Sequence, residues 1–192
     1  CRSQKMFSTE ELIEGCKKKS RRHQDELFSK YSAMLFGVCM RYTKNSFDAQ
    51  DVLQEGFVKI YKKIHMYTIN NSFEGWIRSI MINTAITHYR KNLKHAYHAD
   101  IEDKPNAKVQ QADFGVDEFT REELMKVINA LPDGYRMVFN MYVIEGYKHK
   151  EIAEILEIDI NTSKSQLSRA KKYLQRELLE LSKFNLEGYE EV

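Results

Sequence analysis

Residues that interrupt regular secondary structure are scarce in this chain. Glycine occurs 8 times and proline twice among 192 residues, about 5 % of the sequence against an average of roughly 12 %. Few turns are therefore available, while 42 % hydrophobic and 30 % charged residues supply both a core and a polar surface. At about 150 residues per domain, the length corresponds to one or two domains. We expect a mostly helical fold.

Several classes of protein are excluded by the same sequence. No stretch approaches the roughly 18 uninterrupted apolar residues of a membrane span, and the N-terminus lacks the apolar core of a signal peptide. The three cysteines, Cys1, Cys16 and Cys39, form no C-x-x-C pair. Their odd number suits a reducing cytoplasm better than a disulfide scaffold, and Cys39 is expected to be a small core residue.

Charge is distributed unevenly along the chain, although the net charge is only +2. Residues 75–99 and 160–176 contain no acid but several basic side chains, whereas residues 100–118 carry six acids against two lysines. Two basic segments separated by an acidic connector suggest two DNA-facing modules on a tether. Lysines that only solvate helix surfaces would give the same pattern, so charge alone leaves both interpretations open.

Apolar residues in the N-terminal half recur every three or four positions, which is the spacing of amphipathic helices. Ser8 and Glu11 have the spacing of a capping box, and Asn45 with Ser46 can cap a later helix. The first predicted helix begins at Ser8, and the next three cover residues 23–43, 46–64 and 73–93. Because their connections are short, we expect an antiparallel bundle.

The C-terminal part has the pattern of a helix-turn-helix motif. A short helix, a turn at residues 157–159 and a longer basic helix are typical of this motif. Ala153 is small where its two helices must approach, and Ile158 is placed to fill the turn. Pro132 is expected in the first turn of an earlier helix. The predicted helices cover residues 119–131, 132–143, 148–156 and 160–181.

The final predicted helix separates an apolar face from a polar one. The apolar stripe consists of Leu167, Ala170, Leu174, Leu178 and Leu181. The polar side chains that point away from it are Thr162, Lys164, Gln166, Arg169 and Lys171. Gln can pair with adenine and Arg or Lys with guanine, while other basic residues bind phosphate. An amphipathic helix with a solvated face is the alternative, and the short helix before it favours DNA binding.

An acidic stripe on the third predicted helix has two interpretations. Asp48, Asp51 and Glu55 share a face with Lys59 and Lys62 further along. Acids at the start of a helix and bases at its end complement the helix dipole. On the residues alone, this structural explanation is preferred over a binding surface.

A polar stripe on the fourth predicted helix follows two aromatic residues. Phe73 and Trp76 stand near the helix start, and the stripe itself consists of Asn83, Thr87, Arg90 and Lys94. Hydrogen-bond donors beside aromatic rings suit single-stranded nucleic acid, because bases stack on the rings and phosphates bind cations. A buried core position for Trp76 is equally consistent with the sequence.

Three segments resemble motifs of bacterial sigma factors, in the same order. DAQDVLQEGF at residues 48–57 resembles region 2.2, and FEGWIRSIMIN at 73–83 resembles regions 2.3 to 2.4. Glu145-Gly146, EIA at 151–153 and TSKSQLSRA at 162–170 are similar to region 4. Their order and spacing and the chain length match the extracytoplasmic-function (ECF) subfamily of the sigma-70 family, which keeps only the second and fourth sigma domains. The resemblance extends over residues 23–182.

The resemblance implies an all-α protein of two small helical domains joined by a flexible acidic linker. The first domain would cover residues 8–94, the linker 95–116, and the second domain, with its helix-turn-helix, 117–182. Such a protein binds core RNA polymerase and directs promoter recognition, promoter melting and transcription initiation. The implied partners are core RNA polymerase, promoter DNA and an anti-sigma factor. No cofactor, metal, catalytic residue or direct membrane insertion is implied.

The resemblance also implies roles for individual residues. Those that face the polymerase are Asp48, Asp51, Gln54 and Glu55, which reverses the preference for the dipole explanation. Those at or near the melted minus-ten element are Trp76, Arg78, Asn83, His88, Arg90 and Lys91. Those that read the minus-thirty-five element are Thr162, Ser163, Lys164, Gln166, Ser168, Arg169, Lys171 and Lys172.

Three positions depart from the pattern of the subfamily. Thr87 stands where many members have Asp, Glu157 where a turn glycine is common, and Asn161 where glycine usually precedes the recognition threonine. Asn tolerates positive φ better than most residues. The departures that matter are therefore Glu157, for the geometry of the turn, and Thr87, for contact with the minus-ten element.

Other classes of function have less support. His95, His98 and Asp100 could be imagined as metal ligands, but no second pair completes a site, and an exposed helix end explains them. A Gly-rich phosphate loop and a Ser or Cys nucleophile signature are both absent. A DNA-binding transcriptional regulator that does not bind core polymerase is the nearer alternative. A helical adaptor that binds only protein is the third.

Limited proteolysis tests the expected division of the chain. If residues 100–116 form an exposed acidic tether, a protease cuts there first and releases two folded fragments, because exposed polar segments are the preferred sites of nicking. Mass spectrometry of the early fragments locates the first cut. Initial cleavage within residues 47–92 would contradict the proposed boundary.

Overall fold

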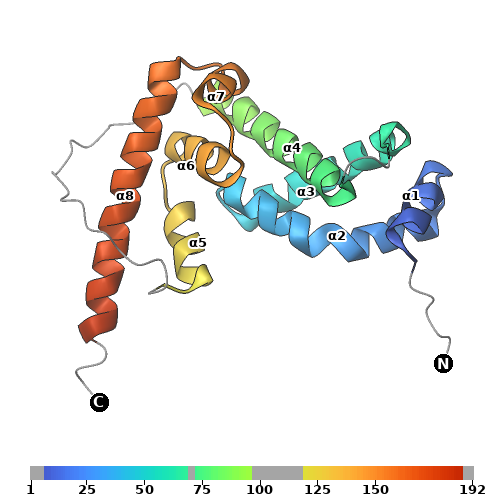
Figure 1. Cartoon of the computed structure of the whole chain (residues 1–192), viewed down its shortest axis with the longest axis horizontal. Coiled ribbons are helices and arrows are strands. Elements are labelled where there is room, and N and C mark those ends of the chain that lie inside the picture. The colour runs from blue at the N-terminus through green and yellow to red at the C-terminus, as the bar shows by residue number, and fades with distance from the viewer. Residues whose placement is uncertain (1–6, 69–71, 97–118, 188–192) are drawn as a thin grey trace. The chain divides into compact units, whose positions relative to one another are not determined.

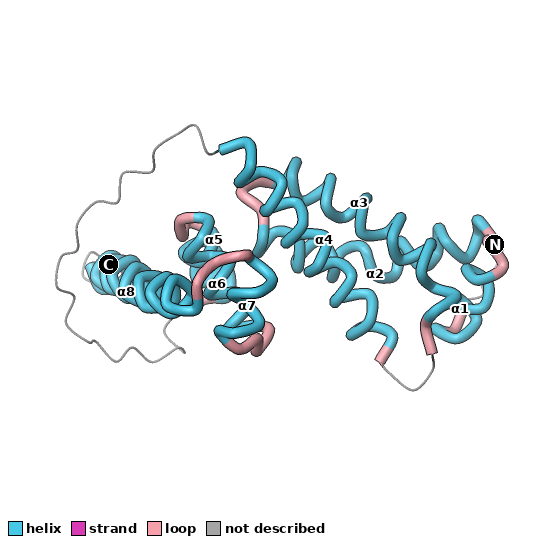
Figure 2. Tube along the Cα trace, turned by 90° about the horizontal axis from the view of Figure 1, so that it is seen from above, coloured by secondary structure: helices cyan, strands magenta, loops and turns pink. Residues whose placement is uncertain are grey.

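The computed structural model describes residues 7–68, 72–96 and 119–187 (Figure 1). The regular elements of these residues are all helical (Figure 2), which confirms the predicted all-α class. The chain divides into two compact units, residues 1–91 and 92–192, and each is described by itself. Beyond its first two positions, the predicted linker at 95–116 lies outside the described residues. Among the described helices, none combines the length and hydropathy needed to cross a membrane.

The first unit begins its helices at the caps predicted from the sequence. Ser8 Oγ accepts a hydrogen bond from the backbone N–H of Glu11 (3.2 Å), and the Glu11 carboxylate accepts one from the N–H of Ser8 (2.9 Å). Asn45 Oδ1 accepts from the N–H of Asp48 (2.9 Å). Both predicted caps are confirmed. The described elements are α1 (Thr9–Lys17), α2 (Arg21–Tyr42), α3 (Ser46–Lys63), η1 (Ile64–Met66) and α4 (Phe73–Ala96).

Apolar side chains at helical spacing form the core of the first unit. The largest of them are fully buried: Leu12, Leu27, Leu35, Ile60, Ile64, Ile77 and Met81. Burial of each such side chain stabilises the fold by about 1.5–3 kcal/mol. Cys39 is also fully buried, as predicted. Gly56 lets α4 approach α3 closely, because a Cβ at this position would overlap the thioether end of Met81.

The second unit contains α5 (Arg121–Asn129), α6 (Asp133–Phe139), η3 (Asn140–Ile144), α7 (His149–Leu156) and α8 (Ile160–Glu187). Two predictions hold in outline and differ in detail. Pro132 is not inside the first turn of α6 but is its N-cap, in an extended conformation with ψ 145°. The helix predicted to reach residue 143 ends as an α-helix at Phe139 and continues as a π-helical turn. Helical periodicity cannot distinguish these two forms within a single turn.

A buried arginine joins α5 to α6. Arg136 is 3 % exposed, and its Nη1 donates to the carbonyl oxygens of Asn129 and Leu131, both at 3.2 Å. Its Nη2 donates to Asp133 Oδ1 at 2.9 Å. These carbonyls lie at the end of α5, where no intrahelical donors remain. Arg136 of α6 therefore caps the C-terminal end of α5.

The apolar stripe of α8 is buried only in its N-terminal half. Leu167 is 6 % exposed and Ala170 is fully buried, whereas Leu174, Leu178 and Leu181 are half-buried. The described contacts of α8 are with α5, α6 and α7. Since α8 has 28 residues, these shorter helices cover it incompletely. The sequence pattern predicted the buried face correctly but not how far along the helix burial extends.

The turn between α7 and α8 forms without the glycine that is common there. Glu157 adopts a left-handed conformation with φ 57° and ψ 45°, and its cap N–H donates to the carbonyl of Ala153. Asp159 Oδ1 then accepts from the N–H of Asn161 at 2.7 Å, which caps α8. Ala153 is buried, as expected at the helix contact, and Ile158 is half-buried. The helix-turn-helix geometry is thus reached with a strained residue at its corner.

Replacing Glu157 by glycine is expected to stabilise the second unit. A left-handed conformation costs an L-residue roughly 1–2 kcal/mol, of which the flexibility of glycine in the unfolded chain offsets about 0.5–1 kcal/mol. Glu157→Gly should therefore raise the free energy of unfolding by about 0.5–1 kcal/mol, measured by chemical denaturation. Glu157→Ala is the matched control, because it removes the same side chain but keeps the strain. Equal stability of the two variants would show that the backbone conformation is not the cause.

Candidate functional site

The N-terminal half of α8 presents a basic polar face to solvent. Five of the residues predicted to read DNA are exposed there: Lys164, Ser168, Arg169, Lys171 and Lys172. Thr162 is half-buried at the helix start. Leu167 and Ala170 anchor the opposite face in the core, so the orientation of the polar face is set by burial. Because residues 160–176 contain no acid, this face is suited to bind an anion.

Ser163 does not belong to that face, because its side chain is not exposed for the predicted contact with DNA. Its side chain is fully buried, and its Oγ lies 2.9 Å from His149 Nδ1. Ser163 precedes Leu167 by one helical turn, so both fall on the side of α8 that packs against the unit. The hydroxyl therefore joins α8 to α7.

Gln166 also differs from its predicted orientation. Its side chain is half-buried and lies against Gly134 of α6, where an added Cβ would come within 3.0 Å of Gln166 Nε2. Gln166 thus stands at the edge of the polar face and reaches toward α6. The absence of a side chain at Gly134 makes room for it.

His149 is part of this site, although the sequence analysis did not select it. Its ring stacks on that of Tyr142, with centroids 4.5 Å apart and an interplanar angle of 23°. Burial is the main cause that lowers the pKa of His149, and the positive charges of Lys164 and Lys171 lower it further. The only signal in the sequence was a histidine at the start of the first helix of the motif, which is too common to be informative.

The acidic stripe of α3 is partly neutralised within the unit. Asp51 and Gln54 are exposed, whereas Asp48 and Glu55 are half-buried. Glu55 forms an ion pair with Lys59 at 2.7 Å, and the hydrogen bond from Lys59 is the main cause that lowers the Glu55 pKa. This pair agrees with a structural role for the end of the stripe. Asp51 and Gln54 remain as its exposed part.

The two predicted faces of the first unit meet at one contact between α3 and α4. His88 Nε2 lies 3.9 Å from Asp48 Oδ1. His88 was predicted to face DNA, and Asp48 to face the polymerase. Both side chains are half-buried, and His88 Nε2 has no hydrogen-bond partner among the described residues.

The residues predicted to contact the minus-ten element differ in exposure along α4. Asn83 and Lys91 are exposed, whereas Trp76, Arg78, His88 and Arg90 are half-buried. Trp76 packs against Tyr67 and Phe73, with ring centroids 5.4 and 5.9 Å away. It is therefore neither a core residue nor a free stacking surface. Thr87, the departure from the subfamily pattern, donates its hydroxyl to the carbonyl of Asn83 at 2.8 Å.

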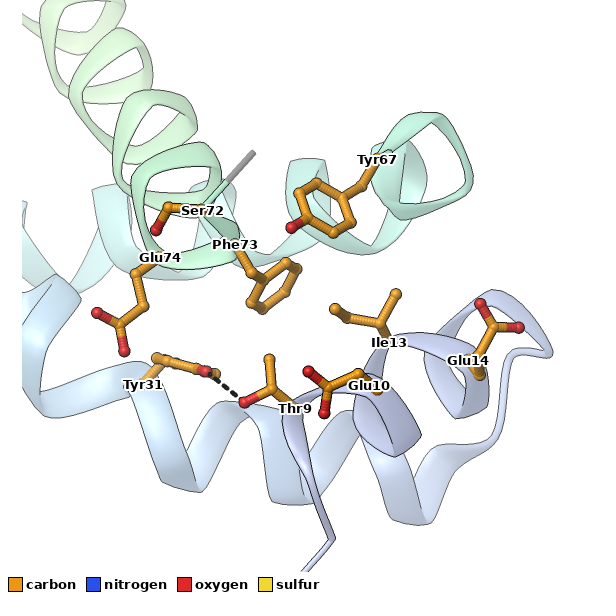
Figure 3. A pocket seen from close by; sticks show the side chains of 9 residues that line it. All are labelled: Thr9, Glu10, Ile13, Glu14, Tyr31, Tyr67, Ser72, Phe73 and Glu74. Carbon is orange, nitrogen blue, oxygen red and sulfur yellow. Dashed lines mark hydrogen bonds between the residues drawn. The ribbon is translucent and has the colours of Figure 1, made fainter. Parts of the chain in front are cut away.

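A cavity of about 330 Å³ opens beside this aromatic cluster, between α1, α2, η1 and the start of α4 (Figure 3). Its walls include Tyr31, Tyr67 and Phe73. Three glutamates also line it: Glu10, Glu14 and Glu74. None of the predicted site residues does so. Carboxylates on its walls give this cavity the wrong charge for a phosphate group.

Metal binding finds no geometric support in the part of the chain that the structure covers. No group of three His, Cys, Asp or Glu side chains there could hold an ion. His98 and Asp100 lie outside the described residues, as does the side chain of His95.

Comparison with known proteins identifies both units. The family model for sigma-70 region 2 matches residues 27–94, and that for sigma-70 region 4 matches residues 121–174. The chain is 31 % identical over 162 residues to the ECF RNA polymerase sigma factor SigW of Bacillus subtilis, which covers 79 % of this chain and 86 % of that protein. It is 24 % identical over 180 residues to the RNA polymerase sigma-H factor of Pseudomonas aeruginosa. That alignment covers 88 % of this chain and 93 % of the sigma-H factor.

Solved structures give weaker matches. The sigma factor RpoE of Bartonella quintana, solved in complex with the anti-sigma factor NepR, aligns with a TM-score of 0.47 at 20 % identity, over 80 % of this chain and 95 % of that one. CnrH, solved in complex with the cytosolic domain of CnrY, aligns with a TM-score of 0.45 at 18 % identity, over 88 % of this chain and 96 % of CnrH.

Proposed function

This chain belongs to the ECF subfamily of the sigma-70 family, and we propose how its two units divide the work of an alternative sigma factor. Sigma factors of this kind bind core RNA polymerase and direct promoter recognition and transcription initiation. In the proposal, α3 binds the polymerase, α4 binds the minus-ten element and α8 reads the minus-thirty-five element. The observation that carries it is the exposed, acid-free basic face of α8 over a buried apolar stripe.

The proposed polymerase contact centres on Asp51 and Gln54. Both side chains are exposed on the outer face of α3, while Glu55 is held by Lys59. Among the described residues no basic side chain forms an ion pair with Asp51, so its carboxylate has no internal charge to displace when a positively charged partner approaches. Complementary charge across an interface contributes chiefly to specificity and to the rate of association. Asp51 is therefore the best position for a test by charge reversal.

Asp51→Arg is expected to weaken binding to core RNA polymerase by at least about tenfold, because like charges placed together across an interface cost several kcal/mol. The full-length chain carrying a fluorescent label is titrated with core enzyme at constant salt. Asp25→Arg makes the same change of charge at another exposed carboxylate, which belongs to α2. It should bind as the wild type does. Both variants should melt like the wild type, since exposed charges contribute little to stability.

If both variants bind core polymerase as the wild type does, α3 is not part of the interface. Loss in both would show that overall charge, and not this face, governs the association. A chain that binds duplex DNA but fails to bind core polymerase at all would instead favour the transcriptional-regulator alternative.

The proposed DNA contact separates base readout from phosphate binding along α8. Arg169 is exposed in the N-terminal half of α8, the half that enters the groove in this motif. Lys172 lies further along and is also exposed. Arg176, one turn beyond Lys172, is also exposed, but its guanidinium pairs with Glu177 at 2.9 Å and lies over the ring of Tyr173. Lys172 is therefore the better position at which to test a contact with phosphate.

Arg169→Ala is expected to change the ranking of minus-thirty-five sequences, whereas Lys172→Ala should lower output on all sequences alike. A lost base contact costs about 1–3 kcal/mol at one position, and a lost phosphate contact reduces the salt slope by about one. The measurement is transcription from a randomised minus-thirty-five library with core polymerase at several salt concentrations. An unchanged ranking in both variants would assign Arg169 to the backbone or to the fold.

Three further expectations stay predictions for this chain. They are action in the cytoplasm, the absence of a catalytic step of its own, and control by an anti-sigma factor. The first two accord with a protein that works by binding polymerase and promoter. An anti-sigma partner would be recovered by affinity purification of the tagged chain from cells in which its promoters are silent.

A further inference from the structure

His149 stands at the junction of three elements of the second unit. It is the first residue of α7, its ring stacks on Tyr142 of η3, and its Nδ1 is 2.9 Å from the hydroxyl of Ser163 in α8. Ser163 is fully buried, so this hydrogen bond fixes the ring against the side of α8. Because Nδ1 is used here, Nε2 is the nitrogen left for a ligand.

The charges around the ring are positive. The groups that act on it are Lys164 and Lys171 from α8, while η3 contributes the neutral Tyr142 ring. Glu151, the acid in the first turn of α7, is turned to the backbone N–H of Lys148 at 2.7 Å. The two lysines are exposed and belong to the basic face. An anion that binds there would approach the ring from solvent and reverse the sign of its surroundings.

We propose that His149, together with Lys164 and Lys171, binds a phosphate of the DNA backbone, and that the ring takes up a proton when it does so. This inference rests on the proposed DNA contact of α8 and adds α7 to it. The first helix of a helix-turn-helix crosses the DNA backbone, and α7 carries His149 at its N-terminal end, where backbone N–H groups and the helix dipole also favour an anion.

The direction of the coupling follows from the two states of the ring. In the free protein, burial and the two lysines lower the His149 pKa below its usual value of 6.5. A phosphate beside Nε2 favours the charged ring and raises the pKa in the complex. DNA binding then takes up a proton in the pH range between the two values. Affinity should increase as pH falls through that range, and the dependence should vanish well above the higher pKa.

The two roles of His149, positioning and phosphate binding, predict different behaviour for His149→Gln. A glutamine retains a hydrogen-bonding group for Ser163 but does not titrate. If His149 only holds α7 to α8, the variant weakens DNA binding equally at every pH, or not at all. If the ring binds phosphate, the variant loses the pH-dependent part of the affinity.

The test uses the full-length chain and a mixed-sequence DNA duplex of about 20 base pairs, because phosphate contacts do not depend on sequence. Dissociation constants are measured by fluorescence anisotropy from about pH 5.5 to about pH 8 at constant ionic strength, the range in which histidine titrates. The wild type should gain about three- to tenfold more affinity on acidification than His149→Gln. The control is His65→Gln, an exposed histidine of η1, which should keep the wild-type dependence.

NMR of the wild-type chain provides a readout that needs no variant. The His149 ring resonances are titrated with and without the duplex, and the pKa should rise on DNA binding. An unchanged pKa, or an equal pH dependence in His149→Gln and wild type, would overturn the inference. If the chain does not bind the duplex at any salt concentration, the proposed DNA contact of α8 itself fails, which is a separate result.

Discussion

A helix in a small domain can bury only one of its faces, and this constraint organises both units. The buried faces carry side chains such as Leu35 and Met81 in the first unit and Met137 and Ile152 in the second. The remaining faces are largely polar, although large apolar side chains such as Phe47 and Val58 are exposed on α3, and the direction of these faces is set by the buried one. The faces of α3, α4 and α8 that we propose to bind partners are thus consequences of core packing as much as of their own residues.

Internal contacts decide which charges on those faces are available to a partner. Glu55 is held by Lys59, and Arg176 by Glu177. Each of these two ion pairs uses a group that a simple charge count would assign to DNA or polymerase. The surface offered for binding is therefore smaller than the sequence indicates, and Asp51 belongs to the part that remains exposed.

Local interactions were predictable because they depend on residues a few positions apart. The capping box of Ser8 and the cap at Asn45 follow from side chains that reach the backbone three residues away. The helix-turn-helix followed from hydrophobic spacing and a short turn. The capping box of Thr120 and Glu123 has the same signature in the sequence. The π-helical turn after Phe139 was not predictable, because a single turn is too short to show a periodicity distinct from that of an α-helix.

The sequence by itself determined the helical class, the buried stripe at Leu167 and Ala170, and the basic character of the opposite face, since these depend on composition and periodicity along one chain. The tertiary structure alone decided the roles of side chains at the border between the two faces. Ser163 turned inward to His149, and Gln166 turned toward Gly134. Helical spacing places a border residue within a wide arc of directions. The neighbour that fills the space beside it comes from a distant part of the chain, and packing against that neighbour selects the direction.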